Sequence, residues 1–323
     1  MPVSGTFDNP SIGYYAARSH RVINIDKCLL ADANNNIVIE ILREWLKTYS
    51  IRPYDETTHT GLLRHVMIRT NRSGQMMIVL VINGKTLKHT EEMLSMLRDK
   101  LPTLVSLCIS ENTKRGNVIL GEDYRVIWGE EHLEDILCGC HFQLSPLSFF
   151  QVNSTQTEKL YNTALSFASL TGSESVADLY CGVGTISLML AKKAKHVTGI
   201  EIVPQAIENA RDNALLNSCL NTEFMVGSAE DVAPLLQKRP EAAPDVIVVD
   251  PPRKGCDEKL IATMLVLAPK RIVYVSCDPA TLARDLAALL DSGEYCLEKV
   301  QPVDMFPMAG HVETVCLLER VAN

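Results

Sequence analysis

The sequence contains no apolar run that approaches the roughly 20 residues needed to cross a bilayer. Its first residues show no basic region followed by an apolar stretch, so we predict no secretory signal. Internal repeats and low-complexity tracts are also absent. These features indicate an ordinary globular chain, and its 323 residues are enough for two domains with cores of their own.

An excess of basic residues is missing too. The chain has 31 Lys and Arg against 39 Asp and Glu, which gives a net charge of −8. This balance argues against a protein that coats nucleic acid without specificity. A local basic path can still exist within an acidic total, and the candidates that we favour are Arg64, Arg69, Arg72 and Arg253.

Cysteines are present without the spacing of a metal or disulfide framework. The ten cysteines are scattered, and the close pair Cys138 and Cys140 lacks the Cys-x-x-Cys spacing of a zinc site. We therefore predict reduced thiols, a cytoplasmic location and no metal site. Because cysteine is among the most buried residue types, each one is by default a core residue.

A nucleotide-binding pattern begins at residue 176. An apolar stretch is followed by Gly182 and Gly184 and then by a helical pattern over 186–195. Glycines let the backbone approach a ligand closely. Sixteen residues after Thr185, a second strand-like segment ends in Glu201. A carboxylate there can accept hydrogen bonds from both ribose hydroxyls of a dinucleotide or of S-adenosylmethionine.

Two further strand-like runs end in groups that can take part in chemistry. The run 245–249 ends in Asp250 and two prolines, which hold a rigid extended turn. Nicotinamide enzymes have no general need for this element, whereas methyltransferases that act on bases often carry one. The run 271–275 is followed by Cys277, and a thiol at such a strand end can act as a nucleophile in the ligand crevice. The plainer interpretations are that the two prolines only end a strand and that Cys277 is a core residue.

These segments together resemble the RNA uracil-C5 methyltransferases that make 5-methyluridine in ribosomal and transfer RNA. The resemblance rests on the motifs at 178–185, 250–255, 276–281 and 311–314, with Phe-Phe-Gln-Val-Asn at 149–153 before them. It covers residues 145–323, and a weaker likeness reaches back to Ile12. The resemblance implies a doubly wound, Rossmann-like S-adenosylmethionine methyltransferase domain at 139–323. The α+β pattern of 1–138 predicts a domain that contributes to an RNA platform.

The resemblance also implies catalytic roles. Carbon 5 of uracil is a poor nucleophile, and addition of a thiolate at carbon 6 activates it. Cys277 is the candidate for this thiolate, and Glu313 is the candidate base that removes the proton from carbon 5. From spacing alone Glu313 can also be a strand residue that faces solvent. His311 is a rival base, for which a satisfied structural histidine is the plainer interpretation.

Binding roles follow in the same way. The predicted contacts with S-adenosylmethionine are Gln151, Tyr180, Gly182, Thr185, Glu201, Ser228 and Asp250. Thr185 and Ser228 depart from the asparagine that the family often carries, so a hydroxyl changes or removes these two contacts. Phe149 and Arg253 are the predicted RNA contacts, with stacking on a base for Phe149. A core position is the alternative for Phe149.

The leading hypothesis is methylation of a uridine in ribosomal RNA, 23S rRNA above all, with transfer RNA as the alternative substrate. Methylation of an amino group of adenine or guanine needs no cysteine and is a second hypothesis. A noncatalytic RNA-binding factor is a third. Many family members carry an N-terminal β-barrel, and some an iron–sulfur cluster held by four cysteines. No barrel-length segment precedes Ile12 and only Cys28 matches a cluster ligand, which predicts a minimal or truncated member without the cluster.

Overall fold

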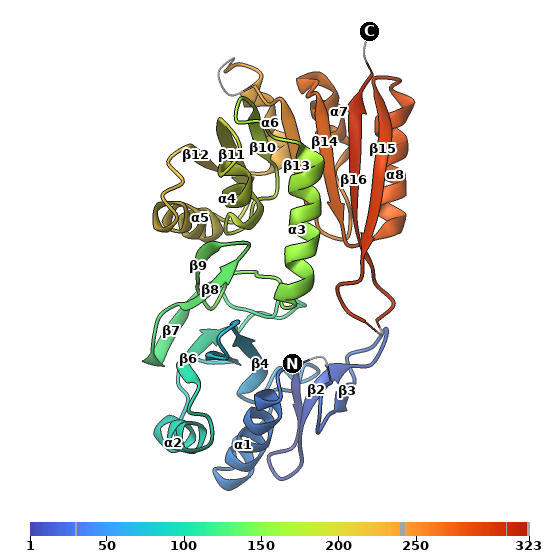
Figure 1. Cartoon of the computed structure of the whole chain (residues 1–323). Coiled ribbons are helices and arrows are strands. Elements are labelled where there is room, and N and C mark those ends of the chain that lie inside the picture. The colour runs from blue at the N-terminus through green and yellow to red at the C-terminus, as the bar shows by residue number, and fades with distance from the viewer. Residues whose placement is uncertain (30, 240–242, 308, 322–323) are drawn as a thin grey trace. The chain divides into compact units, whose positions relative to one another are not determined.

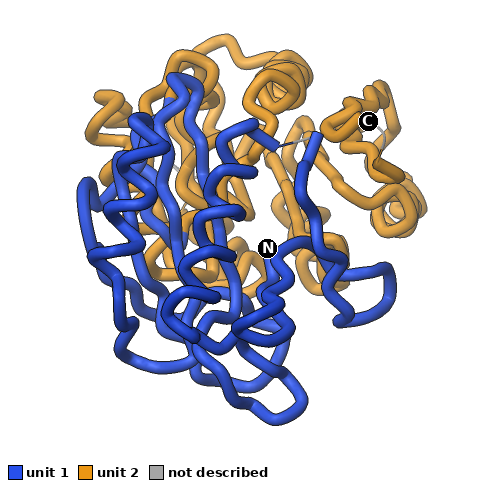
Figure 2. Tube along the Cα trace, turned by 90° about the horizontal axis from the view of Figure 1, so that it is seen from below, with its two compact units in different colours: residues 1–135, 144–147 blue, residues 136–143, 148–323 orange. Residues whose placement is uncertain are grey.

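The computed structural model describes residues 1–29, 31–239, 243–307 and 309–321. The chain forms two compact units, which Figure 2 shows in two colours. Unit 1 contains residues 1–135 and 144–147, and unit 2 contains residues 136–143 and 148–323. The chain therefore passes from one unit to the other three times between residues 135 and 148, so the boundary is a short segment rather than one position.

Unit 1 consists of a three-stranded sheet, a four-stranded sheet and two helices. Its elements are β1 (Val3–Gly5), β2 (Pro10–Tyr15), β3 (Val22–Asn24), α1 (Asn34–Thr48), β4 (Leu63–Thr70), β5 (Met76–Ile82), α2 (Thr90–Lys100), β6 (Leu104–Glu111) and β7 (Tyr124–Gly129). The four-stranded sheet has the order β4-β5-β6-β7. Strand β4 pairs antiparallel with β5, and the mixture of these strands with α1 and α2 agrees with the α+β pattern of this part of the sequence.

The core of unit 1 forms around β5 and α1. Every residue of β5 is buried, as expected for an apolar run in the middle of a sheet. Helix α1 buries one apolar face, because its apolar residues recur three and four positions apart. Trp45 lies fully buried on that face, and its indole nitrogen donates a hydrogen bond to the carbonyl oxygen of His89 at 2.8 Å.

A hairpin spans the boundary between the units. Strands β8 (Leu133–Leu137) and β9 (Cys140–Leu144) pair with each other alone. Their two-residue turn, Cys138 and Gly139, has positive φ angles of 51° and 70°, as such hairpins require. Within unit 2, the backbone N–H groups of His141 and Gln143 donate to the side chains of Asn217 and Asn213, both at 2.8 Å. Cys138 lies in the turn and Cys140 is buried, so both cysteines of this pair have structural positions in the hairpin.

Unit 2 is built on a seven-stranded sheet of order β12-β11-β10-β13-β14-β16-β15 (Figure 1). The strands are β10 (Ser175–Asp178), β11 (His196–Glu201), β12 (Thr222–Val226), β13 (Val246–Val249), β14 (Arg271–Ser276), β15 (Tyr295–Val303) and β16 (Glu313–Arg320). Strands β10 to β14 are parallel, whereas β16 is antiparallel to both of its neighbours. The sheet is therefore mainly parallel, with an antiparallel edge.

Helices cover both faces of this sheet. They are α3 (Ser154–Ala168), α4 (Thr185–Ala191), α5 (Pro204–Leu216), α6 (Ala229–Leu236), α7 (Glu258–Leu267) and α8 (Pro279–Asp291). One core joins the sheet to α6, α7 and α8, while α3, α4 and α5 contact strands on the opposite face. None of the helices in the described ranges is both long and apolar enough to span a bilayer.

The order of strands creates a switch point. The chain runs outward from β10 through β11 to β12, then returns to the other side of β10 with β13 and β14. The connections on the two sides of this point lead to opposite faces, which leaves a crevice at the carboxyl ends of β10 and β13. Ligands of open α/β sheets bind in such a crevice.

Truncating Trp45 tests the core of unit 1. We expect Trp45→Ala to lower the free energy of unfolding by about 3–5 kcal/mol, because it leaves a cavity and an unpaired carbonyl group. The measurement is urea unfolding followed by circular dichroism. Glu44→Ala, at an exposed position of the same helix, is the control and should change the stability by less than about 0.5 kcal/mol. A loss below about 1 kcal/mol for Trp45→Ala contradicts this account.

Candidate active site

The glycine turn after β10 opens the crevice. Gly182 and Gly184 have φ angles of +54° and +86°, which favour glycine, and Gly184 is the residue before α4. A side chain at Gly184 would also meet Ala210, since a Cβ there would lie 3.3 Å from the Cβ of Ala210. The turn thus keeps its backbone open toward the carboxyl end of β10, as a nucleotide-binding turn requires.

Glu201 lies at the end of β11 and faces this turn. One carboxylate oxygen accepts from the backbone N–H of Gly182 at 3.3 Å, and the other accepts from the N–H of Val203 at 3.0 Å. Each carboxylate oxygen has a second lone pair with which to accept a ligand hydroxyl. Glu201 is thus oriented in advance beside the glycine turn.

Asp178 is a buried carboxyl group to which the sequence analysis assigned no role. It ends β10, is fully buried and accepts a 2.6 Å hydrogen bond from the hydroxyl of Ser187 on α4. Burial raises its pKa to about 6, against the hydrogen bonds that favour the charged form. Asp178 therefore ties the strand end to α4 and places a second acidic group beside Glu201. Its place at the end of an apolar run was the available signal.

Three predicted cofactor contacts occupy the rim of the crevice. Tyr180 packs partly buried against the core that joins the sheet to α6, α7 and α8. Thr185 is the first residue of α4, and Ser228 is the residue before α6. The hydroxyl of Ser228 donates to Asp231 at 2.8 Å. Tyr180 and Thr185 follow the carboxyl end of β10, and Ser228 follows the carboxyl end of β12. Glu201 ends β11, which lies between these two strands.

Asp250 directly follows β13, next to β10 in the sheet. Burial is the main cause that raises its pKa to about 8, and the charges of Glu313 and Asp178 act in the same direction. Its carboxyl group is thus largely protonated near neutral pH and can donate a hydrogen bond. Asp250 is therefore within electrostatic reach of Asp178 at the end of β10 and of Glu313, the first residue of β16.

Cys277 lies where the sequence predicted it, directly after β14 and half-buried. The next residue, Asp278, caps α8 by accepting from the N–H groups of Ala280 at 2.9 Å and Thr281 at 3.2 Å. The hydroxyl of Ser276 accepts from the N–H of Asp278 at 3.1 Å. The thiol is thus carried on a short, hydrogen-bonded turn between a strand and a helix rather than in the core.

The register of β14 with β16 brings Glu313 to the thiol. The β14–β16 ladder ends with Ser276 paired with Thr314; Cys277 follows Ser276 and Glu313 precedes Thr314, so the two residues flank this last pair on facing chain segments. Residues directly opposite each other in such a ladder carry their side chains on the same face. Glu313 also pairs with Val303 of β15 on its other side. Two residues 36 positions apart in sequence thus become neighbours at the edge of the sheet.

The electrostatic surroundings of this pair are acidic with one basic neighbour. Burial raises the pKa of the Cys277 thiol, the charges of Glu313 and Asp250 raise it further, and Arg253 lowers it. Burial likewise raises the pKa of Glu313, and Arg253 opposes this shift. Arg253 therefore acts on both groups.

Two other predicted residues precede α3. Phe149 is 76% exposed, so the core alternative for this residue is wrong; its neighbour Phe150 is buried and packs on Phe142 with ring centroids 5.6 Å apart. Gln151 is half-buried. Within the described residues, no hydrogen bond joins Phe149 or Gln151 to the groups around Cys277.

Two further interpretations need correction. Arg64 is buried in unit 1, where its guanidinium donates to the carbonyl oxygens of Asn112 at 2.6 Å and Lys114 at 2.9 Å, so it is no surface contact for RNA. The sequence could not show this, because both carbonyl groups come from a distant loop. His311 is exposed on the segment before β16 rather than packed as a structural histidine.

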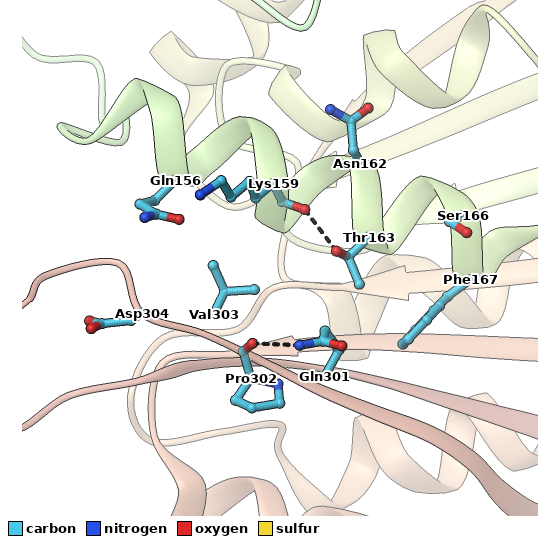
Figure 3. A pocket seen from close by; sticks show the side chains of 10 residues that line it. All are labelled: Gln156, Lys159, Asn162, Thr163, Ser166, Phe167, Gln301, Pro302, Val303 and Asp304. Atoms are coloured by element: carbon cyan, nitrogen blue, oxygen red, sulfur yellow. Dashed lines mark hydrogen bonds between the residues drawn. The ribbon is translucent and has the colours of Figure 1, made fainter.

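An open groove of about 540 Å³ lies between α3 and β15 (Figure 3). Helix α3 lines it with Gln156, Lys159 and Asn162, and β15 and the residue after it contribute Gln301 and Asp304. Val303 also lines the groove and pairs with Glu313, so one end of the groove lies near the start of β16. Most of its polar groups are amides and hydroxyls, and sequence reasoning did not find it.

Comparison with known proteins agrees with this geometry. The chain matches the family described as tRNA (uracil-5-)-methyltransferase over residues 14–321. A relative from Clostridium acetobutylicum, an uncharacterized RNA methyltransferase, is 48% identical over 322 residues, which are 99% of this chain and 70% of the relative. A similarly named relative from Halalkalibacterium halodurans is 50% identical over 308 residues, with 95% and 67% of the two chains covered.

Solved structures give the same result for the fold. The chain is similar to the Pyrococcus abyssi tRNA (uracil-54, C5)-methyltransferase in complex with S-adenosyl-L-homocysteine, with a TM-score of 0.78 and 28% identity over 98% of this chain and 74% of that one. Pyrococcus abyssi Trm5b shares the fold at a TM-score of 0.53 and 18% identity, over 80% of this chain and 75% of that one. The predicted Rossmann-like methyltransferase fold is confirmed. On these grounds the chain belongs to the tRNA (uracil-5-)-methyltransferase family and is an S-adenosylmethionine-dependent RNA methyltransferase.

Proposed function

We propose that this protein methylates carbon 5 of a uridine in RNA through a covalent adduct between Cys277 and carbon 6. The observation that supports the proposal is the β14–β16 register, whose last pair, Ser276 with Thr314, leaves the half-buried Cys277 and Glu313 next to that pair at the carboxyl end of β14. Amino-group methylation would require neither residue in this arrangement. A noncatalytic binding factor would not require them either.

The crevice fits S-adenosylmethionine. The glycine turn leaves room for a ligand, and Glu201 holds its two carboxylate oxygens ready to accept ribose hydroxyls. Bound there, S-adenosylmethionine supplies an electrophilic methyl group. We propose the remaining predicted contacts around it, namely Gln151, Tyr180, Thr185, Ser228 and Asp250. A protonated Asp250 would donate a hydrogen bond rather than accept one.

Cys277 begins the reaction on the RNA. Its thiolate adds to carbon 6 of the uracil, the carbon 5–carbon 6 double bond opens, and the electron pair moves through carbon 5 to the oxygen on carbon 4. The resulting enolate is nucleophilic at carbon 5, which uracil itself is not. Arg253 supports this step because its charge favours the thiolate form of Cys277.

Glu313 completes the reaction. After carbon 5 has gained the methyl group, the Glu313 carboxylate removes the proton that remains on carbon 5. The electrons of that bond re-form the carbon 5–carbon 6 double bond, and Cys277 leaves as a thiolate. The raised pKa of Glu313 makes its carboxylate a stronger base than an exposed glutamate. Its place opposite Cys277 puts it beside the ring that the thiol holds.

The RNA that we propose first is ribosomal, with transfer RNA as the second candidate. The similarity to the Pyrococcus abyssi tRNA (uracil-54, C5)-methyltransferase over 98% of this chain favours the second candidate. For either RNA, we assign the exposed Phe149 to base stacking, Arg253 to RNA contact, and the amide-lined groove between α3 and β15 to flanking nucleotides. Unit 1 is proposed as a further RNA platform, and ten free cysteines suit the cytoplasmic location expected from the sequence.

Substituting the two catalytic candidates separates their roles. We expect Cys277→Ala to lower the rate of methylation of 23S rRNA and of tRNA transcripts by more than about a thousandfold. Glu313→Gln should instead accumulate a protein–RNA complex that survives denaturing electrophoresis, because the adduct forms but its carbon 5 proton is retained.

Cys296→Ala is the control for loss of a thiol, since Cys296 is half-buried on β15. It should keep wild-type activity. Methylation by Cys277→Ala at an unchanged rate would exclude the covalent mechanism. Nuclease digestion and mass spectrometry of the two RNAs identify which transcript carries 5-methyluridine.

The acidity of the medium should control the rate. Glu313 acts as a carboxylate and Cys277 as a thiolate, and burial raises the pKa of both groups. Both active forms therefore become more abundant as pH rises, so single-turnover methylation should increase from about pH 6 to about pH 7.5, a range in which Asp250 still keeps most of its proton. A rate that falls over this range would show that a protonated group limits the reaction instead.

The role of Glu201 is tested by binding alone. We expect Glu201→Gln to weaken S-adenosylhomocysteine binding by about tenfold in calorimetry, because one charged acceptor of the ribose is lost. Glu208→Gln, on the exposed face of α5, is the matched control and should bind as the wild type does. Equal affinities for all three proteins would remove Glu201 from the cofactor site.

A further inference from the structure

Helix α8 forms hydrogen bonds with the backbone of residues 253–256, which we call the arginine segment. The hydroxyl of Thr281 donates to the carbonyl oxygen of Arg253 at 3.1 Å. The guanidinium of Arg284 donates to the carbonyl oxygen of Lys254 at 2.8 Å. The same helix begins two residues after Cys277. One rigid element therefore carries the thiol at its start and fixes the arginine segment along its side.

Asp285 is the buried centre of these contacts. It is 2% exposed, and one carboxylate oxygen accepts from the N–H of Cys256 at 2.7 Å and from the hydroxyl of Tyr274 at 2.6 Å. The other oxygen accepts from Arg284 at 2.8 Å. A buried carboxylate is tolerated when it is paired and hydrogen-bonded in this way. Asp285 thus joins β14, α8 and the arginine segment.

The close approach of the segment to α8 requires glycine at 255. Gly255 has a φ angle of +75°, and a Cβ there would lie 2.5 Å from a carboxylate oxygen of Asp285 and 2.6 Å from the guanidinium of Arg284. No other residue type fits this space without moving the two side chains. The contact is therefore a specific fit.

The hydrogen bonds from Thr281, Arg284 and Asp285 to this segment all involve its backbone groups. The side chain of Arg253 is left exposed, while its electrostatic influence reaches Cys277 and Glu313. Packing of α8 on the sheet is already provided by Leu282, Leu286 and Leu289 in the core. The hydrogen bonds therefore fix the position of the arginine segment and are not what packs α8 on the sheet.

The hydroxyl of Thr281 lies within hydrogen-bond distance of the carbonyl oxygens of both Arg253 and Asp278, so the backbone at Arg253 is held next to the turn that carries Cys277. We propose that Thr281, Arg284 and Asp285 form a positioning clamp that fixes this backbone and thereby the place from which the side chain of Arg253 starts. The clamp deepens the proposed function and rests on it, because it matters only if Cys277 reacts as a thiolate. The titratable and charged groups that act on the thiol are Glu313 from β16 and Asp250 and Arg253 from the segment after β13. Loss of the clamp would let the guanidinium of Arg253 move, while the carboxyl groups of Glu313 and Asp250 would stay in place.

Thr281→Val tests the clamp directly, since it replaces the hydroxyl with a methyl group of similar size at a half-exposed position. The readout is the rate at which iodoacetamide alkylates Cys277, measured against pH by mass spectrometry of the peptide. We expect alkylation near pH 7 to slow by about three- to tenfold, because less of the thiol is ionised. Thr281→Ser keeps the hydroxyl and should restore the wild-type rate.

A double-mutant cycle with Arg253→Gln separates positioning from a general structural role. If the clamp acts through Arg253, Thr281→Val slows alkylation in the wild-type background and has no further effect once Arg253 is replaced. An equal effect in both backgrounds, or none in the wild-type background, overturns the proposal. The assay needs no RNA, so a wild-type protein that fails to methylate uridine would refute the proposed function and leave the clamp readout intact.

Discussion

The antiparallel pairing of β16 with β14 is the constraint on which the proposed chemistry depends. Strand β14 is parallel to β13 on one side and antiparallel to β16 on the other. The ends of β13 and β14 and the start of β16 therefore meet at one edge, with Asp250, Cys277 and Glu313 attached to them. A shift of one residue in this register would turn the Glu313 side chain to the other face. Buried apolar residues in β14 and β16 oppose such a shift.

Charge in the crevice is unbalanced, and this imbalance sets the reactivity of the thiol. Burial and the nearby carboxyl groups raise the pKa of Cys277, and Arg253 is the charged group that acts against them. A thiol held in its neutral form resists oxidation and stray alkylation. The same surroundings raise the pKa of Glu313, which makes it a stronger base. Protection of the nucleophile and strength of the base thus have a common cause.

Much of unit 2 could be predicted from the sequence, because each buried parallel strand is an apolar run. The polar or reactive residue that follows the run marks the end of the strand. Strand β11 ends at Glu201 as predicted, and Glu201 faces the glycine turn. Helix α4 ends at Ala191 rather than near Lys195, since Lys193 and Ala194 form a turn that closes onto Leu190. Asp178 had a signal in the sequence, its place at the end of an apolar run, whereas the buried state of Arg64 depends on a carbonyl group 48 residues away.

The most direct test of the covalent mechanism uses RNA that contains 5-fluorouridine, incubated with S-adenosylmethionine and either wild-type protein or Cys277→Ala. Fluorine cannot leave carbon 5 as a proton, so elimination of the cysteine must stall. The account predicts a methylated RNA adduct on the peptide that contains Cys277, and no adduct in the variant. Methylation of ordinary RNA at carbon 5 without any adduct on Cys277 would contradict it.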